Sequence, residues 1–284
     1  MPLADRAENE GAIMRAPARE NGPVLGHPAR SRLSTATLLR QAVAEFVGTA
    51  LLLVAVIGSG IAAQRLSPGD VGLQLLENAA ATAAALVAII LAVGPVSGAH
   101  LNPVVTLADR VFGGLRATTA VVYAIAQVVG ALAGAVLANL MFALPPVQVA
   151  ATVRTGAGLW LGEVVATFGL ILVVFGVVRS GRSTAAPFAV GAYIAGAYFF
   201  TSSTSFANPA VTIARTLSDT FAGISPSSAP AFVLFQALGG VLGVGTVRLL
   251  YPGIAAVARE AVVPHGVSGD RGSEAECASG DHRR

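Results

Sequence analysis

The sequence predicts an all-α membrane protein in which six transmembrane helices and two short re-entrant half-helices form an inverted repeat. The first observation is composition: the 284-residue chain is 54% hydrophobic and only 12% charged, with a mean hydropathy of +0.71. A soluble domain carries about 25% charged residues, so this chain has too little polar surface for water. The second observation is a set of six apolar segments, and the third is a likeness between the two halves of the chain.

The apolar segments are each close to the ~20 residues that a membrane-spanning helix needs. They cover about residues 40–63, 75–94, 118–143, 159–179, 185–203 and 229–250. Turn-forming stretches rich in Gly, Pro, Ser and Asp separate them, among them SPGD at 67–70, ALPP at 143–146 and RSGRS at 179–183. The pattern predicts an even number of full spans.

Polar stretches flank these segments. Residues 1–36 and 252–284 are polar, and we expect both to be disordered or flexible tails. Between them we expect a membrane domain at 37–251, with repeat one at about 37–144 and repeat two at about 155–251. Arginine is concentrated in the tails and in the loops after the second and fourth segments, and cytoplasmic loops are enriched in basic residues. Both termini are therefore expected to be cytoplasmic, in the inner (plasma) membrane of a cell.

The two halves of the chain resemble each other. AEFVGTALLLVAVIGSG (44–60) is similar to GEVVATFGLILVVFGVV (162–178), which puts Glu45 and Glu163 in equivalent places. SGAHLNPVVTLAD (97–109) is similar to STSFANPAVTIAR (203–215). Three full spans per half is an odd number, so the second half must enter the membrane from the opposite side. Such an inverted repeat places a functional site near the middle of the membrane.

Each half carries an Asn-Pro pair, at Asn102-Pro103 and at Asn208-Pro209. Asn caps the N–H groups at a helix start, and Pro suits the first helical position. The helices that follow are too short to span, so they are either surface helices or half-helices that meet inside the membrane; their recurrence within an inverted repeat favours the second. Two facing helix N-termini put roughly one positive charge at the midplane, which repels cations. The Asn amide N–H groups would remain free to donate, which suits small neutral hydroxylated solutes.

The motifs AEFVGT, SGAHLNPVVT, AQVVGALAGA, GEVVATF and SFANPAVT resemble those of the aquaporin (major intrinsic protein) family, over all six spans and both short helices. The resemblance implies a right-handed six-helix bundle in the lipid bilayer, usually a homotetramer with one pore per subunit. The NPA motif of the family appears as Asn208-Pro209-Ala210 and, with one change, as Asn102-Pro103-Val104. Val in place of Ala after the proline is expected to have little effect on the chemistry.

The resemblance also implies a second constriction toward the outer mouth, at four positions set by their offsets from the two asparagines. These positions are Thr82, Gly196, Ser205 and Val211. Most members have Arg at the position of Val211, and water-selective members have bulky side chains at the first two positions, so this set implies a wider, uncharged filter. Glycerol-like polyols, trivalent metalloid hydroxides such as arsenous acid, and water are then expected to pass. With Val at this position, the chain resembles bacterial aquaglyceroporins associated with arsenic resistance.

A narrower filter would make a mainly water-selective channel, which stays open as an alternative. Aromatic residues near the filter could refill the space: Tyr198, Phe199, Phe200 and Phe206. Arg215 lies one helical turn beyond Val211, about 6 Å along the helix at 1.5 Å per residue. It is expected either to supply a positive charge displaced from the filter position, or to have a structural role. In a structural role it would cap the end of the half-helix or contact lipid headgroups.

Glu45, Glu163 and His100 are ionisable residues within the apolar part of the chain that bear on function. Glu45 and Glu163 are either a proton or cation relay or acceptors that hold the backbone of the re-entrant loops, and the resemblance favours the second. His100 is either a pH-sensitive gate or a fixed hydrogen-bonding residue of its loop. An ion-coupled secondary transporter can also have broken helices, but it would need carboxylates or hydroxyls grouped at the midplane.

Other classes of function find no support in the sequence. The single cysteine, Cys277, lies in the C-terminal tail, so neither an internal disulfide nor a cysteine metal site is expected. No Ser/His/Asp set or paired carboxylate indicates an enzyme, and neither a cofactor nor a metal is expected. The net charge of only +3 gives no support for nucleic-acid binding.

Overall fold

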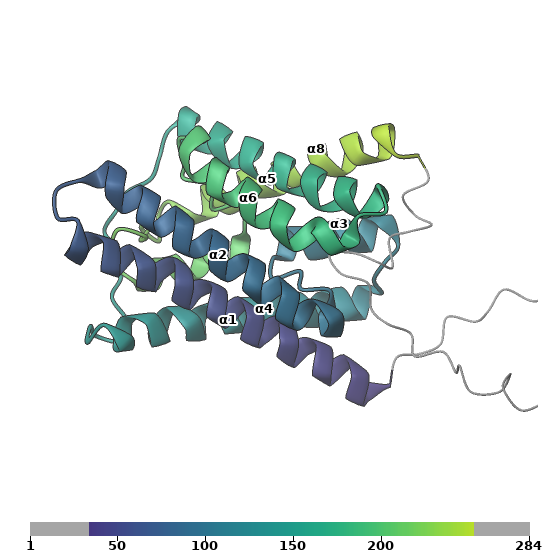
Figure 1. The fold of residues 1–284 in the computed structure, drawn as a ribbon, viewed down its shortest axis with the longest axis horizontal. Helices are drawn as coiled ribbons and strands as arrows, with labels where there is room; N and C mark the ends of the chain where they lie inside the picture. The colour runs from purple at the N-terminus through teal and green to yellow at the C-terminus, as the bar shows by residue number, and fades with distance from the viewer. Residues whose placement is uncertain (1–33, 253–284) are drawn as a thin grey trace, which may run out of the picture. The chain divides into compact units, whose positions relative to one another are not determined.

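A computed structural model describes residues 34–252, which fold mainly into helices (Figure 1). The α-helices are α1 (Thr35–Leu66), α2 (Val71–Ser97), α3 (Pro103–Phe112), α4 (Ala117–Met141), α5 (Ala157–Arg179), α6 (Ala186–Phe200), α7 (Pro209–Ala214) and α8 (Ala229–Leu250). The short 3-10 helices η1 (Ser183–Ala185) and η2 (Arg215–Leu217) precede α6 and follow α7. The tails predicted at 1–36 and 252–284 lie outside the described residues, apart from their innermost positions.

Five of these helices, α1, α2, α4, α5 and α8, are long and apolar enough to cross a membrane. The remaining predicted span, 185–203, forms α6, which has 15 residues. Helix α6 ends at Phe200 because Thr201 takes an extended conformation (φ −105°, ψ 139°). The Thr201 hydroxyl donates to the carbonyl of Ala197 at 2.7 Å, which satisfies one of the last carbonyls of the helix. The end of the predicted span therefore belongs to the re-entrant loop that leads to α7.

The helix contacts repeat between the two halves of the chain. Helix α1 packs against α2 and α4, and α5 packs against α6 and α8 in the same way. Each short helix contacts the last helix of both halves: α3 and α7 both pack against α4 and α8. Contacts of α2 with α6 and of α3 with α7 join the halves. This is the packing that an inverted repeat produces, and it agrees with the predicted fold class.

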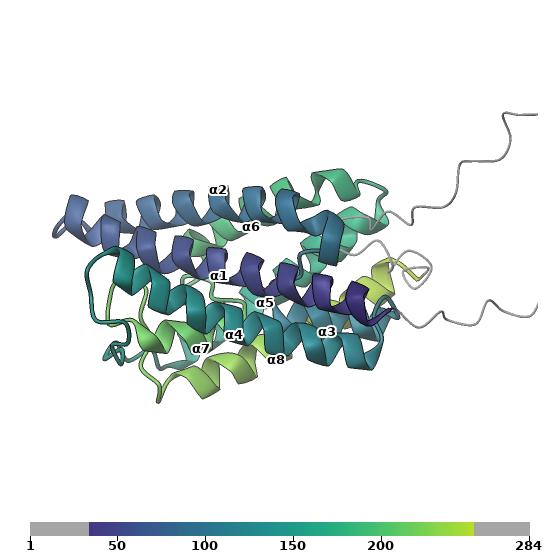
Figure 2. The same cartoon turned by 90° about the horizontal axis from the view of Figure 1, so that it is seen from below.

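The two short helices enter the bundle from opposite ends. Helix α1 begins and α8 ends at the same end of the bundle, on the right in Figure 1, which we call the terminal end. The turn between α1 and α2 lies at the opposite end, which we call the far end. In Figure 2, α3 lies toward the terminal end and α7 toward the far end. Because both helices start in the middle of the bundle, their N-termini face each other there.

Glycine permits close approach of the long helices within each half. A Cβ on Gly130 or Gly134 of α4 would overlap backbone atoms of Phe46 or Ala50 in α1. At the matching crossing of α5 and α8, a Cβ on Gly239 would overlap the carbonyl of Val164. Small residues spaced four apart let membrane helices pack backbone to backbone. The two crossings bring the Glu-bearing helices α1 and α5 directly against the helices that support the re-entrant loops.

Candidate functional site

The two Asn-Pro pairs meet in the middle of the bundle and cap the half-helices as predicted. The Oδ1 atom of Asn102 accepts from the N–H of Val104 at 2.9 Å, and Oδ1 of Asn208 accepts from the N–H of Ala210 at 3.0 Å. Both asparagines have the same extended backbone, with φ at −155°. Each proline takes the first helical position, where no N–H is needed.

The side-chain amides of the two asparagines also tie the loops together. Nδ2 of Asn102 donates to the carbonyl of Ala207 at 2.7 Å, and Nδ2 of Asn208 donates to the carbonyl of Leu101 at 2.7 Å. An amide nitrogen carries two N–H groups, so one N–H of each asparagine is used in this exchange. The expectation that the amide N–H groups remain free therefore needs correction, because only one N–H per asparagine is left for a solute.

The backbone just before each asparagine is held in a conformation that L-residues rarely adopt. Leu101 has a φ of 52° and Ala207 a φ of 49°. A residue other than glycine in the left-handed region costs roughly 1–3 kcal/mol and persists only where its surroundings fix it. Here both peptide groups of each residue are fixed: the carbonyl accepts from the opposite asparagine, and the N–H donates to a buried glutamate.

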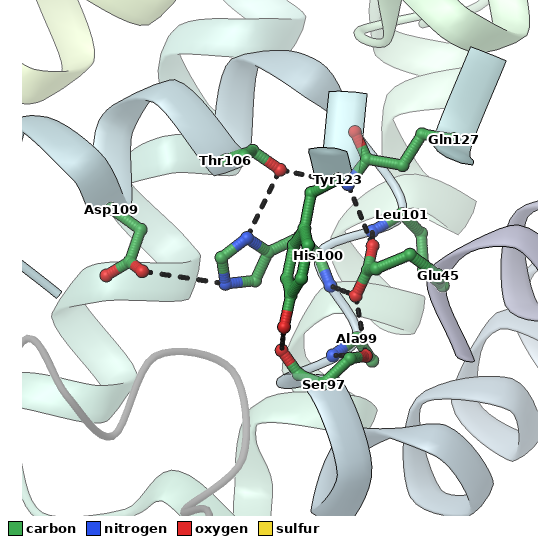
Figure 3. A network of polar contacts seen from close by, with 9 residues as sticks. All are labelled: Glu45, Ser97, Ala99, His100, Leu101, Thr106, Asp109, Tyr123 and Gln127. Atoms are coloured by element: carbon green, nitrogen blue, oxygen red, sulfur yellow. Dashed lines mark hydrogen bonds and ion pairs between the residues drawn. The ribbon is translucent and has the colours of Figure 1, made fainter. Parts of the chain in front are cut away.

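Glu45 of α1 is the acceptor for the first re-entrant loop (Figure 3). Its carboxylate accepts from the backbone N–H groups of His100 at 3.0 Å and Leu101 at 2.8 Å. It also accepts from the hydroxyl of Ser97 at 2.6 Å and from Nε2 of Gln127 at 2.8 Å. The side chain is fully buried, and four donors satisfy the acceptor capacity of an ionised carboxylate. This geometry is what a loop-supporting residue requires.

Glu163 of α5 does the same for the second loop. Its carboxylate accepts from the backbone N–H groups of Phe206 at 3.0 Å and Ala207 at 2.9 Å. Nε2 of Gln236 donates to it at 2.6 Å, and the side chain of Ser203 adds a further hydrogen bond. The inverted repeat thus extends from the helices to individual hydrogen bonds.

The two glutamines also bind the half-helices. Nε2 of Gln127 lies 2.9 Å from the hydroxyl of Thr106 in α3. Nε2 of Gln236 lies 2.8 Å from the hydroxyl of Thr212 in α7. All four side chains are fully buried. Each half-helix is therefore linked to a glutamate through a glutamine on the long helix beside it.

His100 is enclosed by polar and aromatic groups in the first loop (Figure 3). Its Nδ1 lies 3.2 Å from the hydroxyl of Thr106, and its Nε2 lies 3.7 Å from a carboxylate oxygen of Asp109. The ring of Tyr123 meets the imidazole edge to face, with centroids 5.5 Å apart. The contacts fix the ring in its loop, and the buried carboxylate of Asp109 is a partner that was not predicted from the sequence.

A cavity runs past the meeting point of the two loops. Its volume is about 70 Å³, counted as the space open to the centres of water-sized molecules. One water needs roughly 10–15 Å³ by this measure, so the cavity accommodates a few water-sized groups in contact with the loops. One side of its wall is apolar and comes from equivalent positions of the two halves: Leu52, Val56, Leu86 and Ile90 in the first, and Leu170, Val174, Val190 and Ile194 in the second. The re-entrant loops, including Asn102 and Asn208, form the polar side.

Three of the four positions predicted for the filter lie on this wall, namely Thr82, Ser205 and Val211. All three are buried. Gly196 does not line the cavity and is exposed on the outside of the described bundle. Tyr198 lines the cavity instead, and its hydroxyl donates to the hydroxyl of Thr82 at 3.3 Å.

The placement of Gly196 follows from helical geometry. Val190, Ile194 and Tyr198 all line the cavity, and their spacing of four residues puts them on one face of α6. Gly196 is two residues from Tyr198, so it points to the opposite side of the helix. The offset of twelve residues from Asn208 gave the wrong face, and an aromatic side chain occupies the place where a glycine was expected. Of the four aromatic residues considered, Phe199 and Phe200 are exposed, whereas Tyr198 and Phe206 line the cavity.

Truncation of Tyr198 should widen the pore. We expect Tyr198→Ala to raise glycerol flux relative to water flux by about tenfold, the scale of steric discrimination by one or two methylene groups. Stopped-flow swelling of proteoliposomes in glycerol and in an impermeant osmolyte measures both fluxes. Gly196→Ala is the control, because its added Cβ would make only ordinary contact with the ring of Phe200, at 3.4 Å. An effect of the Gly196 variant without an effect of the Tyr198 variant would contradict this assignment.

Asp109 and Arg215 occupy equivalent places in the two halves. Each is the seventh residue after its asparagine, and each is almost completely buried, with 1% and 2% exposure. Asp109 lies beside His100, whereas Arg215 lines the cavity. The signal in the sequence was a charged residue at the same position of both copies of the NP segment. Among the described residues there is no group of three or more His, Cys, Asp or Glu side chains that could hold a metal ion.

A bundle of membrane-spanning helices, with two half-helices meeting over a narrow cavity, defines a membrane channel. The chain belongs to the major intrinsic protein family, because the model of that family matches residues 32–207. Aquaglyceroporin AqpS of Rhizobium meliloti (strain 1021) is 48% identical over 213 residues, which cover 75% of this chain and 91% of the relative. Probable aquaporin TIP1-2 of Oryza sativa subsp. japonica is 32% identical over 178 residues, covering 60% of this chain and 70% of the relative.

A solved structure supports the fold. The X-ray structure of the aquaglyceroporin from Plasmodium falciparum matches with a TM-score of 0.57 and 21% sequence identity. The match covers 77% of this chain and 99% of the other. Its family membership makes this chain a multi-pass membrane channel and not an enzyme, as its sequence predicts.

Proposed function

We propose that this channel passively conducts glycerol-like polyols and trivalent metalloid hydroxides such as arsenous acid, together with water. The observation that carries the proposal is the uncharged, partly apolar filter wall formed by Thr82, Ser205 and Val211. Val211 offers neither the charge nor the hydrogen bonds of the arginine that most members of the family have at this position. The name of the relative from Rhizobium meliloti, an aquaglyceroporin, points to the same class of solute.

The lining of the cavity suits a neutral molecule with hydroxyl groups on one side. Such a solute can turn its hydroxyls toward the loops, where Asn102 and Asn208 each have one N–H available, and its carbon or metalloid side toward the aliphatic wall. The two half-helix N-termini place roughly half a positive charge each at the middle of the pore. A cation that enters loses its hydration and meets this field, whereas a neutral solute does not.

The filter position itself provides the test. Val211→Arg is expected to lower glycerol and arsenous acid flux by about tenfold or more, because steric and polar discrimination in a narrow pocket has this scale. Water, which is smaller, should lose much less. The measurement is stopped-flow light scattering of proteoliposomes with water, glycerol and arsenous acid gradients in parallel.

Val211→Leu is the matched control for this experiment, since it adds volume without charge. We expect it to lower glycerol flux moderately. The ratio of arsenous acid flux to water flux should stay closer to that of the unmodified protein than in Val211→Arg. Equal loss of all three fluxes in Val211→Arg would contradict the argument from size and charge, because it would indicate a collapsed pore.

A mainly water-selective channel is the second candidate. The observation that favours it is the bond between Tyr198 and Thr82, which puts an aromatic side chain across the wall near the filter. Rapid water flux with glycerol and arsenous acid fluxes at the level of protein-free vesicles would establish this alternative. An ion-coupled transporter is disfavoured, because Glu45 and Glu163 are absent from the cavity wall and hold the loops instead.

The membrane orientation is part of the proposal. Arginines at the terminal end of the bundle lie in the last turns of α3 and α5 and in the loops that follow them, namely Arg110, Arg116, Arg179 and Arg182. The positive-inside rule then puts the terminal end in the cytoplasm and the far end outside, with the protein in the plasma (inner) membrane. Large apolar side chains are exposed on the helices, for example Leu51, Leu140 and Val241. This surface fits lipid and the neighbouring subunits of a homotetramer.

A further inference from the structure

We propose that Arg215 is the charged filter residue of this channel, displaced by one helical turn from the place that Val211 occupies. The inference rests on the proposed function, because a filter residue has meaning only in a solute channel. In this role the buried guanidinium of Arg215 excludes cations at the far end of the cavity.

The backbone puts Arg215 directly beyond Val211 on the same face of the short helix. Helix α7 ends at Ala214, and the N–H of Arg215 bonds back to the carbonyl of Val211. Residues four apart in a helix lie above one another, so both side chains reach the cavity wall. Arg215 is therefore one turn farther from the asparagines, toward the far end.

Two contacts fix the side chain of Arg215. Its guanidinium carbon lies 3.4 Å from the centroid of the Phe206 ring, and its Nε donates to the carbonyl of Ala222. Arginine stacks well on aromatic faces because its guanidinium is planar and weakly hydrated. Phe206 is itself held by Glu163 through its backbone N–H. The charge is thus anchored to the re-entrant loop and cannot swing freely into the lumen.

The same guanidinium lies between two hollows. Arg215 lines the central cavity with Ser205 and Val211. It also lines a second hollow of about 490 Å³ with Arg154 and Asp219, on the side of the loops that follow α4 and α7. A solute that passes from this hollow to the asparagines has to move past Arg215. A residue that caps the half-helix or meets headgroups would not line the cavity, so the displaced-charge alternative fits the geometry.

Polar groups that lack partners mark the solute position. Within residues 34–252, only Nε of the Arg215 guanidinium donates a hydrogen bond to the protein. The other four N–H groups of the guanidinium have no acceptor among these residues. The hydroxyl of Ser205 is buried on the same wall and has no hydrogen-bond partner among the described residues. Buried polar groups normally have partners. A hydroxylated solute between these two side chains would supply them.

The displacement explains how a channel can be wide and still exclude cations. Val211 leaves the narrow part of the wall without a long side chain, so solutes larger than water fit. Arg215 keeps a positive charge at the entrance to that part, where a low dielectric environment strengthens its field. Size selection and charge selection, which one arginine performs in most members of the family, are here divided between two residues.

The test compares cation leak with solute flux in the same proteoliposomes. The variants are Arg215→Gln, which removes the charge, and Arg215→Lys, which keeps it. Arg65→Gln is the matched control: its guanidinium also lies over a ring, 5.2 Å from the centroid of Phe142, and donates to a loop carbonyl, but it does not line the cavity. Voltage-driven proton and sodium flux is measured by internal dyes, and glycerol flux by stopped-flow swelling.

We expect Arg215→Gln to raise cation flux by about tenfold, the effect of one unit charge several ångströms away in a partly aqueous pore. Glycerol flux should change by less than about threefold, since the glutamine amide can still donate to a hydroxyl and a neutral solute does not feel the lost charge. Arg215→Lys and Arg65→Gln should keep cation flux near that of the unmodified protein. Arg215→Met, whose unbranched stem can still lie on Phe206, replaces the Gln variant if that one does not reconstitute.

Two results would overturn the inference. One is a Gln or Met variant that conducts glycerol and leaks no more cations than the unmodified protein. The other is a Lys variant that leaks as much as the Gln variant, since the positive charge would then be irrelevant. Failure of the proposed function is distinguishable, because it appears as absent glycerol and arsenous acid flux in the unmodified protein.

Discussion

Replacement of Glu45 by leucine is expected to abolish solute conduction and to leave little folded protein. The substitution removes the acceptor of four buried donors, two of which are the backbone N–H groups of His100 and Leu101. Each unsatisfied buried donor costs roughly 1–3 kcal/mol, so the sum approaches the entire 5–15 kcal/mol that stabilises a typical protein. Leu101, with its φ of 52°, would lose the bond that helps hold it in the left-handed region. Glycerol swelling and thermal unfolding in detergent measure the two effects.

Glu45→Gln and Glu77→Leu are the informative comparisons. The glutamine keeps one acceptor oxygen but turns an amide toward Nε2 of Gln127, so an intermediate loss is expected. Glu77 of α2 accepts from the hydroxyl of Ser67 at 2.7 Å and supports no re-entrant loop, so its replacement should reduce flux far less. By the inverted repeat, Glu163→Leu should behave like Glu45→Leu. Normal glycerol flux in either leucine variant would show that the glutamates do not hold the loops.

Gly134→Leu is expected to prevent assembly of the bundle. Even a Cβ at this position would overlap the backbone of Ala50 in α1, and a backbone atom cannot rotate away as a side chain can. Overpacking costs about 1–3 kcal/mol where neighbours can adjust, and the cost is higher here because the two helices must separate. Separation would also move Glu45 away from its loop, since α1 carries both Glu45 and Ala50. The expected result is loss of monodisperse protein after extraction, measured by size-exclusion chromatography.

Gly245→Leu is the control for this prediction. Gly245 lies on α8, is exposed, and a Cβ there would meet nothing within 4 Å. The variant has the same change in helix propensity and volume, so a normal yield is expected. Comparable loss of both variants would indicate that leucine at any glycine is harmful, and would count against the specific crossing of α1 and α4.

The order of helices and the pairing of the re-entrant segments could be predicted from the sequence because they depend on local patterns. An apolar run of about 20 residues is a membrane helix wherever it packs, since lipid leaves no other way to satisfy its backbone. An Asn-Pro pair starts a helix because the cap and the fixed proline φ act within a few residues. The repeat of these signals, with Glu45 and Glu163 in register, was enough to place two half-helices in opposite directions.

Which side chains form the pore wall could be established only from the tertiary structure. Gly196 and Tyr198 are two residues apart, and only the rotation of α6 against α2 decides which of them reaches the cavity. The end of α6 at Phe200 sets the length of the following loop, so the residue twelve positions before Asn208, Gly196, does not line the cavity. The exchange of hydrogen bonds between Asn102 and the carbonyl of Ala207 joins residues from different halves, and no local pattern records it.

For this protein the family, the order of the helices and the two asparagines at the centre could be predicted from the sequence, because short-range chemistry specifies each of them. The tertiary structure decided which side chains face the solute: it placed Tyr198 on the wall, Gly196 outside, and Arg215 on Phe206 beside the cavity. Helix rotation and loop length control those positions, and both result from the packing of all the helices together. The selectivity of the channel is therefore a property of the assembled bundle.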